Sequence, residues 1–216
     1  MGDQLELDHL VYFVPSLAEA IVEFQNCLGV APHEGGRHEG MGTHNAILPL
    51  AGTKYVELIA KDPTAPTPNQ PRPFGLDALT APRLITWAAR TSDIDAATAR
   101  SRNAGYDPGI ILPMSRKEPG GAELRWKLSL PTSPESMIGD GLVPFIIDWG
   151  NTPHPAHATS NGEPQCELVS FAGCHIKPDP VVVALAALGA ELKVASGTAP
   201  GLRAELRGPA GSLVLD

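Results

Sequence analysis

The stretch LELDHLVYFVPSLAEAIVEFQNCLG (residues 5–29) decides the fold, because its two halves carry different periodicities. Up to residue 14 the apolar side chains alternate as they do in a β-strand. One face of this predicted strand carries Leu5, Leu7, His9, Val11 and Phe13. The opposite face carries Leu10, Tyr12 and Val14, together with Glu6 and Asp8.

The second half of the stretch has helical spacing. Apolar residues recur at positions 17, 20, 21, 24 and 28, which places them on one helix face that can pack on a sheet. Ser16 is a predicted N-cap, and Glu19 completes a capping box three residues later. Gly29 is the predicted terminator of the helix. A strand therefore leads directly into a capped helix.

Two further strands are predicted after this helix. They are THNAILPL (43–50) and TKYVELIA (53–60), and the residues Ala51-Gly52 between them suit a hairpin turn. We expect one more strand near residues 31–38. Residues 1–61 thus form a predicted β-α-β-β(-β) module.

The same order of elements recurs in residues 83–150. A strand at 84–90 precedes a helix at 92–105, with Asp93 as its cap and Gly105 as its stop, and strands follow at 122–130 and 142–150. Gly29 follows His9 by 20 positions, and Gly105 follows Thr86 by 19. A repeated spacing of this kind indicates two copies of one structural unit.

Two other segments complete the predicted organisation. Residues 62–82 contain six prolines and form an extended, semi-rigid connector between the modules. Residues 151–216 repeat the β-α-β-β order in shortened form, with a helix at 179–189 that Asp179 caps and Pro180 begins. The predicted fold class is α+β: paired modules whose mixed sheet curls into a cup with helices outside, and a third unit that flanks or completes the sheet.

The composition narrows the class of protein. A chain of 216 residues with 43% apolar content can bury a real core, and it has no apolar run long enough to span a membrane. A net charge of −8 argues against nucleic acid as a partner. Three cysteines without metal spacing are typical of reduced thiols in a cytoplasmic protein. We therefore expect a partner that is a small molecule.

Two polar residues occupy positions where apolar ones are expected. His9 lies on the apolar face of the first strand, and Glu57 is central in the strand YVELIA. Taken alone, His9 can be explained as a core histidine whose hydrogen bonds are satisfied, and Glu57 as a residue at the rim of the sheet. Together, on the first and last strands of one unit, they can face one hollow. Histidine with a carboxylate suits a divalent metal ion such as Zn, Ni, Mn or Fe.

The motifs DHLVYFV, GTHNAILPL, YVELI, LRWKLSLP and PFIIDWG carry a family resemblance. Over roughly residues 7–180 the chain resembles the glyoxalase-like domain proteins of the vicinal oxygen chelate superfamily. The resemblance implies paired β-α-β-β-β modules that form a cup, in which a divalent metal chelates two adjacent oxygens of the substrate. It also implies metal ligands from the first and last strands of each module, which here are His9 and Glu57.

The second module departs from this ligand pattern. Thr86 stands opposite His9 in the repeat, and threonine is a poor metal ligand. The counterpart of Glu57 falls near 146–148, where Asp148 is the candidate carboxylate ligand. Either His9 and Glu57 hold the metal with His44 or Asp148, or the cup binds its ligand without metal.

The glycine-rich stretch GGRHEGMGTHNAI (35–47) runs into a strand at the expected rim of the cup. His44 is a candidate ligand or general base, since histidine titrates near neutral pH. Arg37, His38 and Asn45 are candidate substrate-binding residues. The alternative is a solvated hairpin with ordinary surface histidines.

Further cations lie in the second module. If Leu124, Trp126, Leu128 and Leu130 pack under the helix, Arg125 and Lys127 face the cup and suit an anionic substrate. The alternative is an edge strand protected by its charges. Arg116 is a weaker candidate for closing over the site, and His154 and His157 are expected to be loop residues that can reach its entrance.

These features favour an enzyme with metal-assisted lyase or isomerase chemistry on a small, oxygenated, anionic substrate. In that interpretation the metal acts as a Lewis acid while His44 or Glu57 moves a proton. An Fe(II) oxygenase fits less well, because the second module offers no second histidine. The alternative is a metal-free binding or resistance protein with the same cup. The cup closes either within one chain or across a homodimer.

Overall fold

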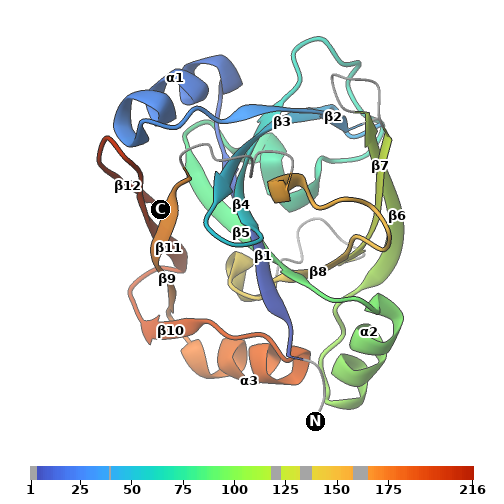
Figure 1. Cartoon of the computed structure of the whole chain (residues 1–216). Helices are drawn as coiled ribbons and strands as arrows, with labels where there is room; N and C mark the ends of the chain where they lie inside the picture. The colour runs from blue at the N-terminus through green and yellow to red at the C-terminus, as the bar shows by residue number, and fades with distance from the viewer. Residues whose placement is uncertain (1–3, 39, 118–122, 132–137, 158–164) are drawn as a thin grey trace.

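The computed structural model describes residues 4–38, 40–117, 123–131, 138–157 and 165–216. Within these residues, eight strands close into a barrel, and three α-helices and a second, four-stranded sheet lie outside it (Figure 1). This arrangement confirms the predicted α+β class and the curled sheet. Within the described residues no helix is both long and apolar enough to cross a membrane.

The first module has the predicted order with the additional strand near 31–38 present. Its elements are β1 (Glu6–Phe13), α1 (Leu17–Leu28), β2 (His33–His38), β3 (Thr43–Leu50) and β4 (Lys54–Lys61). The Ser16 hydroxyl accepts a hydrogen bond from the backbone N–H of Glu19, as an N-cap does. Gly29 ends the helix at φ 76°, a left-handed conformation that glycine adopts without a Cβ penalty.

The second module contains one strand that the sequence pattern did not indicate. Its elements are β5 (Arg83–Arg90), α2 (Ile94–Asn103), β6 (Ile110–Lys117), β7 (Glu123–Leu130) and β8 (Phe145–Asp148). Strand β6 was missed because Pro113 interrupts it, and proline is unusual inside a paired strand. Asp93 caps α2 by accepting from the backbone N–H of Ala96 at 2.9 Å.

The barrel closes by equivalent contacts between the two modules. The strand order is β1-β4-β3-β2-β6-β7-β8-β5, so each module contributes four neighbouring strands. The first strands of the two modules, β1 and β5, pair antiparallel, and so do their third elements, β2 and β6. Within each module the first and last strands are parallel neighbours. Both modules therefore present side chains to one interior.

Apolar side chains form one layer inside the barrel and another outside it. The inner cluster includes Val11, Phe13, Ile59, Phe145 and Ile147. The outer cluster is larger and includes Leu10, Phe24, Val56, Trp87 and Leu185, from strands and helices. Because strand side chains alternate, the polar residues that share a face with the inner cluster are buried in the barrel.

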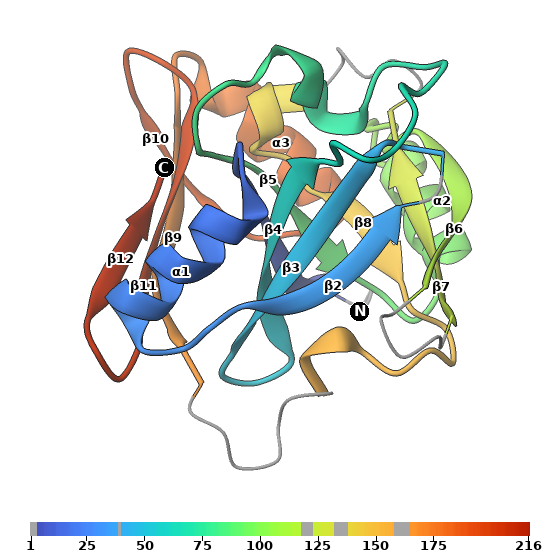
Figure 2. The same ribbon diagram turned by 90° about the horizontal axis from the view of Figure 1, so that it is seen from above.

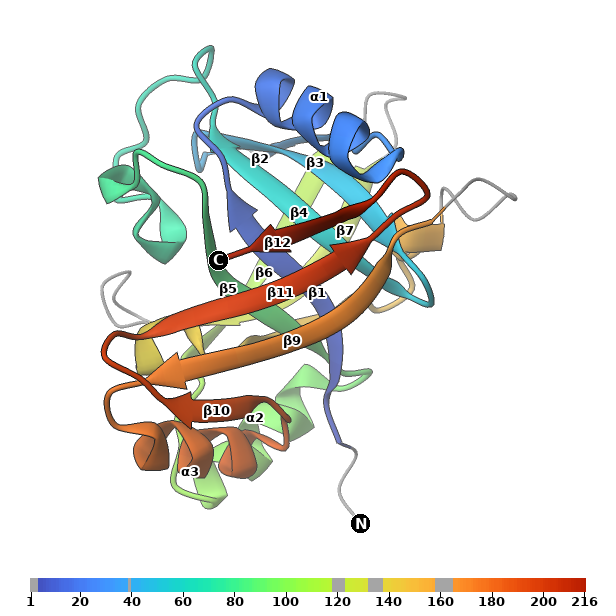
Figure 3. The same ribbon diagram turned by 90° about the vertical axis from the view of Figure 1, so that its left-hand side faces the viewer.

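The third unit forms a sheet of its own instead of extending the barrel (Figure 3). Its elements are β9 (Glu167–His175), α3 (Pro178–Leu188), β10 (Lys193–Ser196), β11 (Gly201–Arg207) and β12 (Ser212–Leu215). Helix α1 lies between the barrel and β12 (Figure 2). The prediction that Asp179 caps α3 is wrong: Lys177 is the cap residue, and Asp179 lies in the first turn.

The proline-rich connector crosses from one module to the other and forms a 3₁₀ segment at Pro73–Ala78. The Nε of Arg72 donates to the carbonyl of Gly42 at 2.9 Å, which ties the connector to the loop before β3. Phe74 in this segment has φ 60° and ψ 20°. Two further 3₁₀ segments lie at Ile138–Gly141 and Pro155–His157.

Candidate functional site

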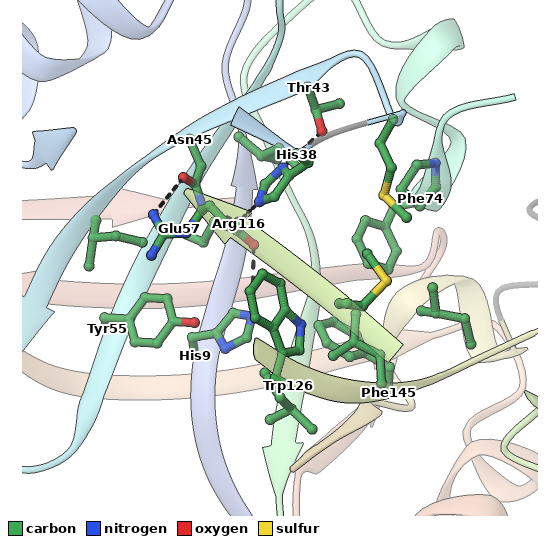
Figure 4. Close-up of a pocket in the computed structure, with 18 of the residues that line it drawn as sticks. His9, His38, Thr43, Asn45, Tyr55, Glu57, Phe74, Arg116, Trp126 and Phe145 are labelled. Carbon is green, nitrogen blue, oxygen red and sulfur yellow. Dashed lines mark hydrogen bonds and ion pairs between the residues drawn. The ribbon is translucent and has the colours of Figure 1, made fainter. Parts of the chain in front are cut away.

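The barrel interior contains a pocket to which both modules and the connector contribute. Strands β1 to β4 supply a group of polar side chains, whereas the second module supplies mostly apolar ones. Figure 4 shows His9, Glu57, Asn45 and Arg116 on one side of this pocket, and Phe74 and Phe145 on the other.

Glu57 lies at the centre of the polar side. Its Oε2 is 3.8 Å from Nε2 of His9, and its Oε1 is 3.7 Å from Nε2 of His38. Asn45 donates a hydrogen bond from Nδ2 to Glu57 Oε1 at 2.5 Å. The glutamate side chain is only 11% exposed, so its charge is stabilised mainly by these neighbours. The predicted convergence of His9 and Glu57 on one hollow is present.

Asp8 orients His9 from behind. Its Oδ1 lies 2.6 Å from His9 Nδ1, and its Oδ2 lies 3.0 Å from His154 Nε2 and 3.2 Å from Trp149 Nε1. Burial raises the pKa of Asp8, but hydrogen bonds from His154 and His9 outweigh this effect and hold the pKa well below its usual value. The ionised carboxylate therefore accepts a hydrogen bond from His9 Nδ1 and turns Nε2 toward Glu57.

The sequence pattern placed Asp8 on the outer face of the first strand, and that placement was wrong. The register between β1 and β5 shifts between Leu7 and His9, which breaks the simple alternation. Asp8 is fully buried as a result. The signal available in the sequence was the adjacent pair Asp8-His9, a carboxylate beside an imidazole. The partner His154 comes from the segment after the second module, so sequence proximity does not reveal it.

His38 and Tyr55 complete the surroundings of Glu57. His38 Nδ1 lies 2.9 Å from the hydroxyl of Thr43, and burial lowers the pKa of its ring, which is therefore neutral at pH 7. Tyr55 stacks on His9 with ring centroids 4.5 Å apart. Burial, with the nearby carboxylates of Asp8 and Glu57, raises the pKa of Tyr55 well above its usual value.

Arg116 is the cation of the pocket. Its side chain comes from β6, and the whole residue is 4% exposed. Nη1 donates to Asn45 Oδ1 at 3.3 Å, while Nδ2 of the same amide donates to Glu57, so Asn45 links the two charges. Gly35 makes this possible, because a Cβ there would overlap both Asn45 Oδ1 and Arg116 Nη1. Gly35 thus gives these two side chains room.

The other candidates on β2 and β3 lie outside the barrel. Arg37 bonds to Asp62 and Thr64, and its side chain is 60% exposed. His44 is half-buried, and burial lowers its pKa. Because Thr43 and Asn45 line the pocket, the alternation of β3 turns His44 to the opposite face. The predicted roles of Arg37 and His44 in the site therefore do not fit their positions.

The predicted orientation of β7 is wrong. Trp126, Leu128 and Leu130 line the pocket, whereas Arg125 pairs with Glu123 and Lys127 pairs with Asp95 on the outer surface. The inside of the barrel is itself apolar at this strand, so the apolar face turns inward.

Asp148 also lies outside the pocket. Its Oδ2 accepts from the backbone N–H of Ile94 at 3.3 Å, and its Oδ1 accepts from that of Gly150 at 2.8 Å. Asp148 therefore stabilises the first turn of α2 and is not placed to coordinate a metal ion in the pocket. The side chain of His157 falls outside the described residues.

The described residues do not provide the donor set expected for a divalent metal. Among them, no group of three or more His, Cys, Asp or Glu side chains is arranged to hold an ion. The second module offers Arg116 on this side of the pocket, and one oxygen of Glu57 already accepts from Asn45. Thr86, the counterpart of His9, is buried, and its hydroxyl has no partner among the described residues. The predicted metal ion does not fit these donors.

One solved structure shares the fold over nearly the whole chain, and methylmalonyl-CoA epimerases match it less closely. A hypothetical protein from Staphylococcus aureus matches with a TM-score of 0.72 at 12% identity, covering 98% of this chain and 99% of that one. Methylmalonyl-CoA epimerase from Mycobacterium tuberculosis matches with a TM-score of 0.46 at 20% identity, covering 74% and 96%. A methylmalonyl-CoA epimerase from Streptomyces coelicolor gives 0.46 at 16% identity, covering 71% and 100%.

Comparison with sequences shows the family. No protein with a curated description matches the chain. The glyoxalase-like domain family matches residues 7–189, which include both modules and helix α3. The paired modules, the closed barrel and this match agree with one another, and the chain belongs to the glyoxalase-like domain family.

Proposed function

We propose that the barrel pocket is the active site of an isomerase- or lyase-type enzyme that moves a proton on a small, oxygenated, anionic molecule. The observation that carries this proposal is the carboxylate of Glu57, which is buried between two imidazoles and opens onto a largely apolar pocket. A carboxylate held in such a place is a suitable general base for a proton next to a carbonyl or carboxylate group.

The neighbours of Glu57 supply the complementary roles. His9 directs Nδ1 to Asp8 and Nε2 into the pocket, so that it can exchange a proton at Nε2 while the ionised Asp8 stabilises the imidazolium form. His38, which is neutral at pH 7, can offer one ring N–H to a developing oxyanion.

Arg116 supports the anionic character of the substrate. It replaces Arg125 and Lys127 as the candidate anion-binding group, since it is the buried arginine that lines the pocket. Its charge also favours the enolate-like state that forms when Glu57 removes a proton, because a fixed cation in a dry site acts strongly on developing negative charge.

Exchange of substrate protons for deuterium tests the proposal without knowledge of the product. The protein is incubated in D₂O with a panel of 2-oxo acids and 2-aryl carboxylic acids. Loss of the signal of the exchangeable proton, on C3 of the oxo acids and on C2 of the aryl acids, is followed by ¹H NMR. We expect exchange above the buffer rate for at least one class, lowered about 100-fold or more in Glu57→Gln. His44→Ala is the matched control and keeps the wild-type rate. Exchange that persists in Glu57→Gln contradicts the proposal.

A metal-free binding protein is the second candidate, and the mostly apolar lining of the pocket favours it. Such a protein binds its ligand without turning it over. Tight binding of a panel member without any deuterium exchange supports the binder over the enzyme.

A further inference from the structure

The two ends of the pocket have different chemistry. Glu57, Asn45 and Arg116 gather at one end, while Phe74 and Phe145 lie at the other (Figure 4). Trp126 lies between the two groups. A ligand that fills the pocket therefore meets charge at one end and aromatic rings at the other.

Phe74 is held in its place by the connector. Its positive φ of 60° is disfavoured for a residue with a side chain, so the surrounding contacts must maintain it. Lys61 Nζ donates to the carbonyls of Asp77 and Leu79 at 3.0 and 3.1 Å, which anchors the 3₁₀ segment on β4.

The ring of Phe74 is stacked on Phe145, with centroids 5.3 Å apart and an interplanar angle of 28°. Met41 and Met114 line the same pocket, and thioether sulfurs make favourable contacts with ring edges. Flat rings and polarizable sulfur together suit a flat, aromatic ligand group better than a puckered aliphatic one.

We propose that the ligand of this pocket carries an aromatic ring on a short chain that ends in a carboxylate, and that Phe74 is the residue that sets this specificity. The ring lies against Phe74, Phe145 and Trp126, and the carboxylate lies at Arg116. The proposal rests on the proposed function for the place of the anion, and it adds the chemical class of the rest of the molecule. It gives the proline-rich connector a role in recognition.

Calorimetric titration tests this specificity with named probes. Phenylacetate, 3-phenylpropionate and 4-phenylbutyrate are titrated first, because the series varies the distance between ring and carboxylate. The best of them is then compared with its cyclohexyl analogue and with propionate. We expect the aromatic acid to bind about 2- to 10-fold more tightly than the cyclohexyl acid, and propionate to bind most weakly. Equal or tighter binding of the cyclohexyl acid overturns the proposal, and so does a failure of all three aryl acids to bind.

Two variants locate the preference on the connector. Phe74→Ala removes the ring, and we expect it to weaken the aromatic acid about 10-fold while changing propionate less than about twofold. Phe171→Ala is the matched control, because this ring packs on Trp87 outside the pocket. It is expected to leave both affinities unchanged. An aromatic preference that survives Phe74→Ala contradicts the role of Phe74.

Failure of this proposal and failure of the proposed function give different results. The titration requires no turnover. A preference for the aromatic acid that depends on Phe74, without any deuterium exchange, therefore supports the proposed ligand class and contradicts the proposed enzymatic function. Deuterium exchange that depends on Glu57, with no preference for the aromatic acid, supports the proposed enzymatic function and contradicts the proposed ligand class.

Discussion

Glu57 Oε2 lies 3.8 Å from His9 Nε2 because β1 and β4 are parallel neighbours in the barrel. Val11 stands opposite Glu57 in the register, which leaves His9 two residues away on the same inward face. The neighbouring strand β3 adds Asn45 to the same polar group. The first and last strands of the module, β1 and β4, are far apart in the sequence, and the pairing between them brings His9 next to the Glu57 carboxylate.

Asp8→Asn is expected to destabilise the protein at pH 7 by about 2–3 kcal/mol, since the charged partner of three buried donors is lost. The pKa of Asp8 is lower in the folded state than its usual value of 3.8. Its contribution is therefore fully present above that pH and is lost as the pH falls below it.

Urea unfolding at pH 7 and at pH 3 measures this contribution. The difference in unfolding free energy between wild type and Asp8→Asn is expected to shrink at the lower pH. Asp140, exposed on the surface, provides the control Asp140→Asn. A difference between wild type and Asp8→Asn that does not change with pH contradicts the account of the Asp8 carboxylate.

Gly35→Ala is expected to displace Arg116 and Asn45, because the new methyl group overlaps both side chains. We expect a loss of roughly 1–3 kcal/mol in unfolding free energy, typical of overpacking, and weaker binding of a carboxylate probe such as 3-phenylpropionate. Gly201→Ala is the control, since a methyl group there has open space. Unchanged stability and binding in Gly35→Ala would show that the glycine is not needed for this packing.

Arg116→Gln is expected to weaken binding of 3-phenylpropionate about 10-fold or more, since a charge-assisted contact to a buried group is lost. Arg125→Ala and Lys127→Ala are expected to leave the affinity unchanged, because both side chains form ion pairs on the outer surface. Isothermal titration of the three variants compares them directly. A stronger effect from either surface cation than from Arg116 would reverse the assignment.

The purified protein is expected to contain substoichiometric metal, because the described residues offer no group of three suitable ligands. Elemental analysis after dialysis measures the metal content. His9→Ala, Glu57→Ala and the control His44→Ala complete the experiment. One equivalent of metal that is lost in the first two variants and kept in the third would establish the metal-assisted mechanism instead.

The sequence predicted most of the elements because local signals specify them. The spacing of residues 17–28, the Ser16 cap and the Gly29 terminator each agree with the observed α1. The strands with clear alternation were found as well. Strand β6 was missed because Pro113 and the mixed polarity of residues 110–117 resemble a loop more than a paired strand.

The candidate site was only partly predictable. His9, His38, Asn45 and Glu57 were identified and lie in the pocket. His9 and Glu57 stand out as polar residues within apolar strands, whereas His38 and Asn45 belong to the polar, glycine-rich stretch 35–47. Arg125 and Lys127 were assigned to the wrong side because alternation fixes which residues share a face but not which face turns inward. Arg116, at the end of the missed strand, was identified only as a weak candidate.

The sequence by itself determined the repeated modules and the helix ends, because these depend on spacings of a few residues within one element. It also identified His9 and Glu57, because each is a polar residue within an apolar strand. The tertiary structure decided which cation shares the pocket with Glu57, that His154 lies behind Asp8, and that the connector places Phe74 in the pocket wall. Those contacts join segments that are distant in the chain. They depend on the closure of the barrel and on a one-residue shift in register, and neither leaves a local pattern in the sequence.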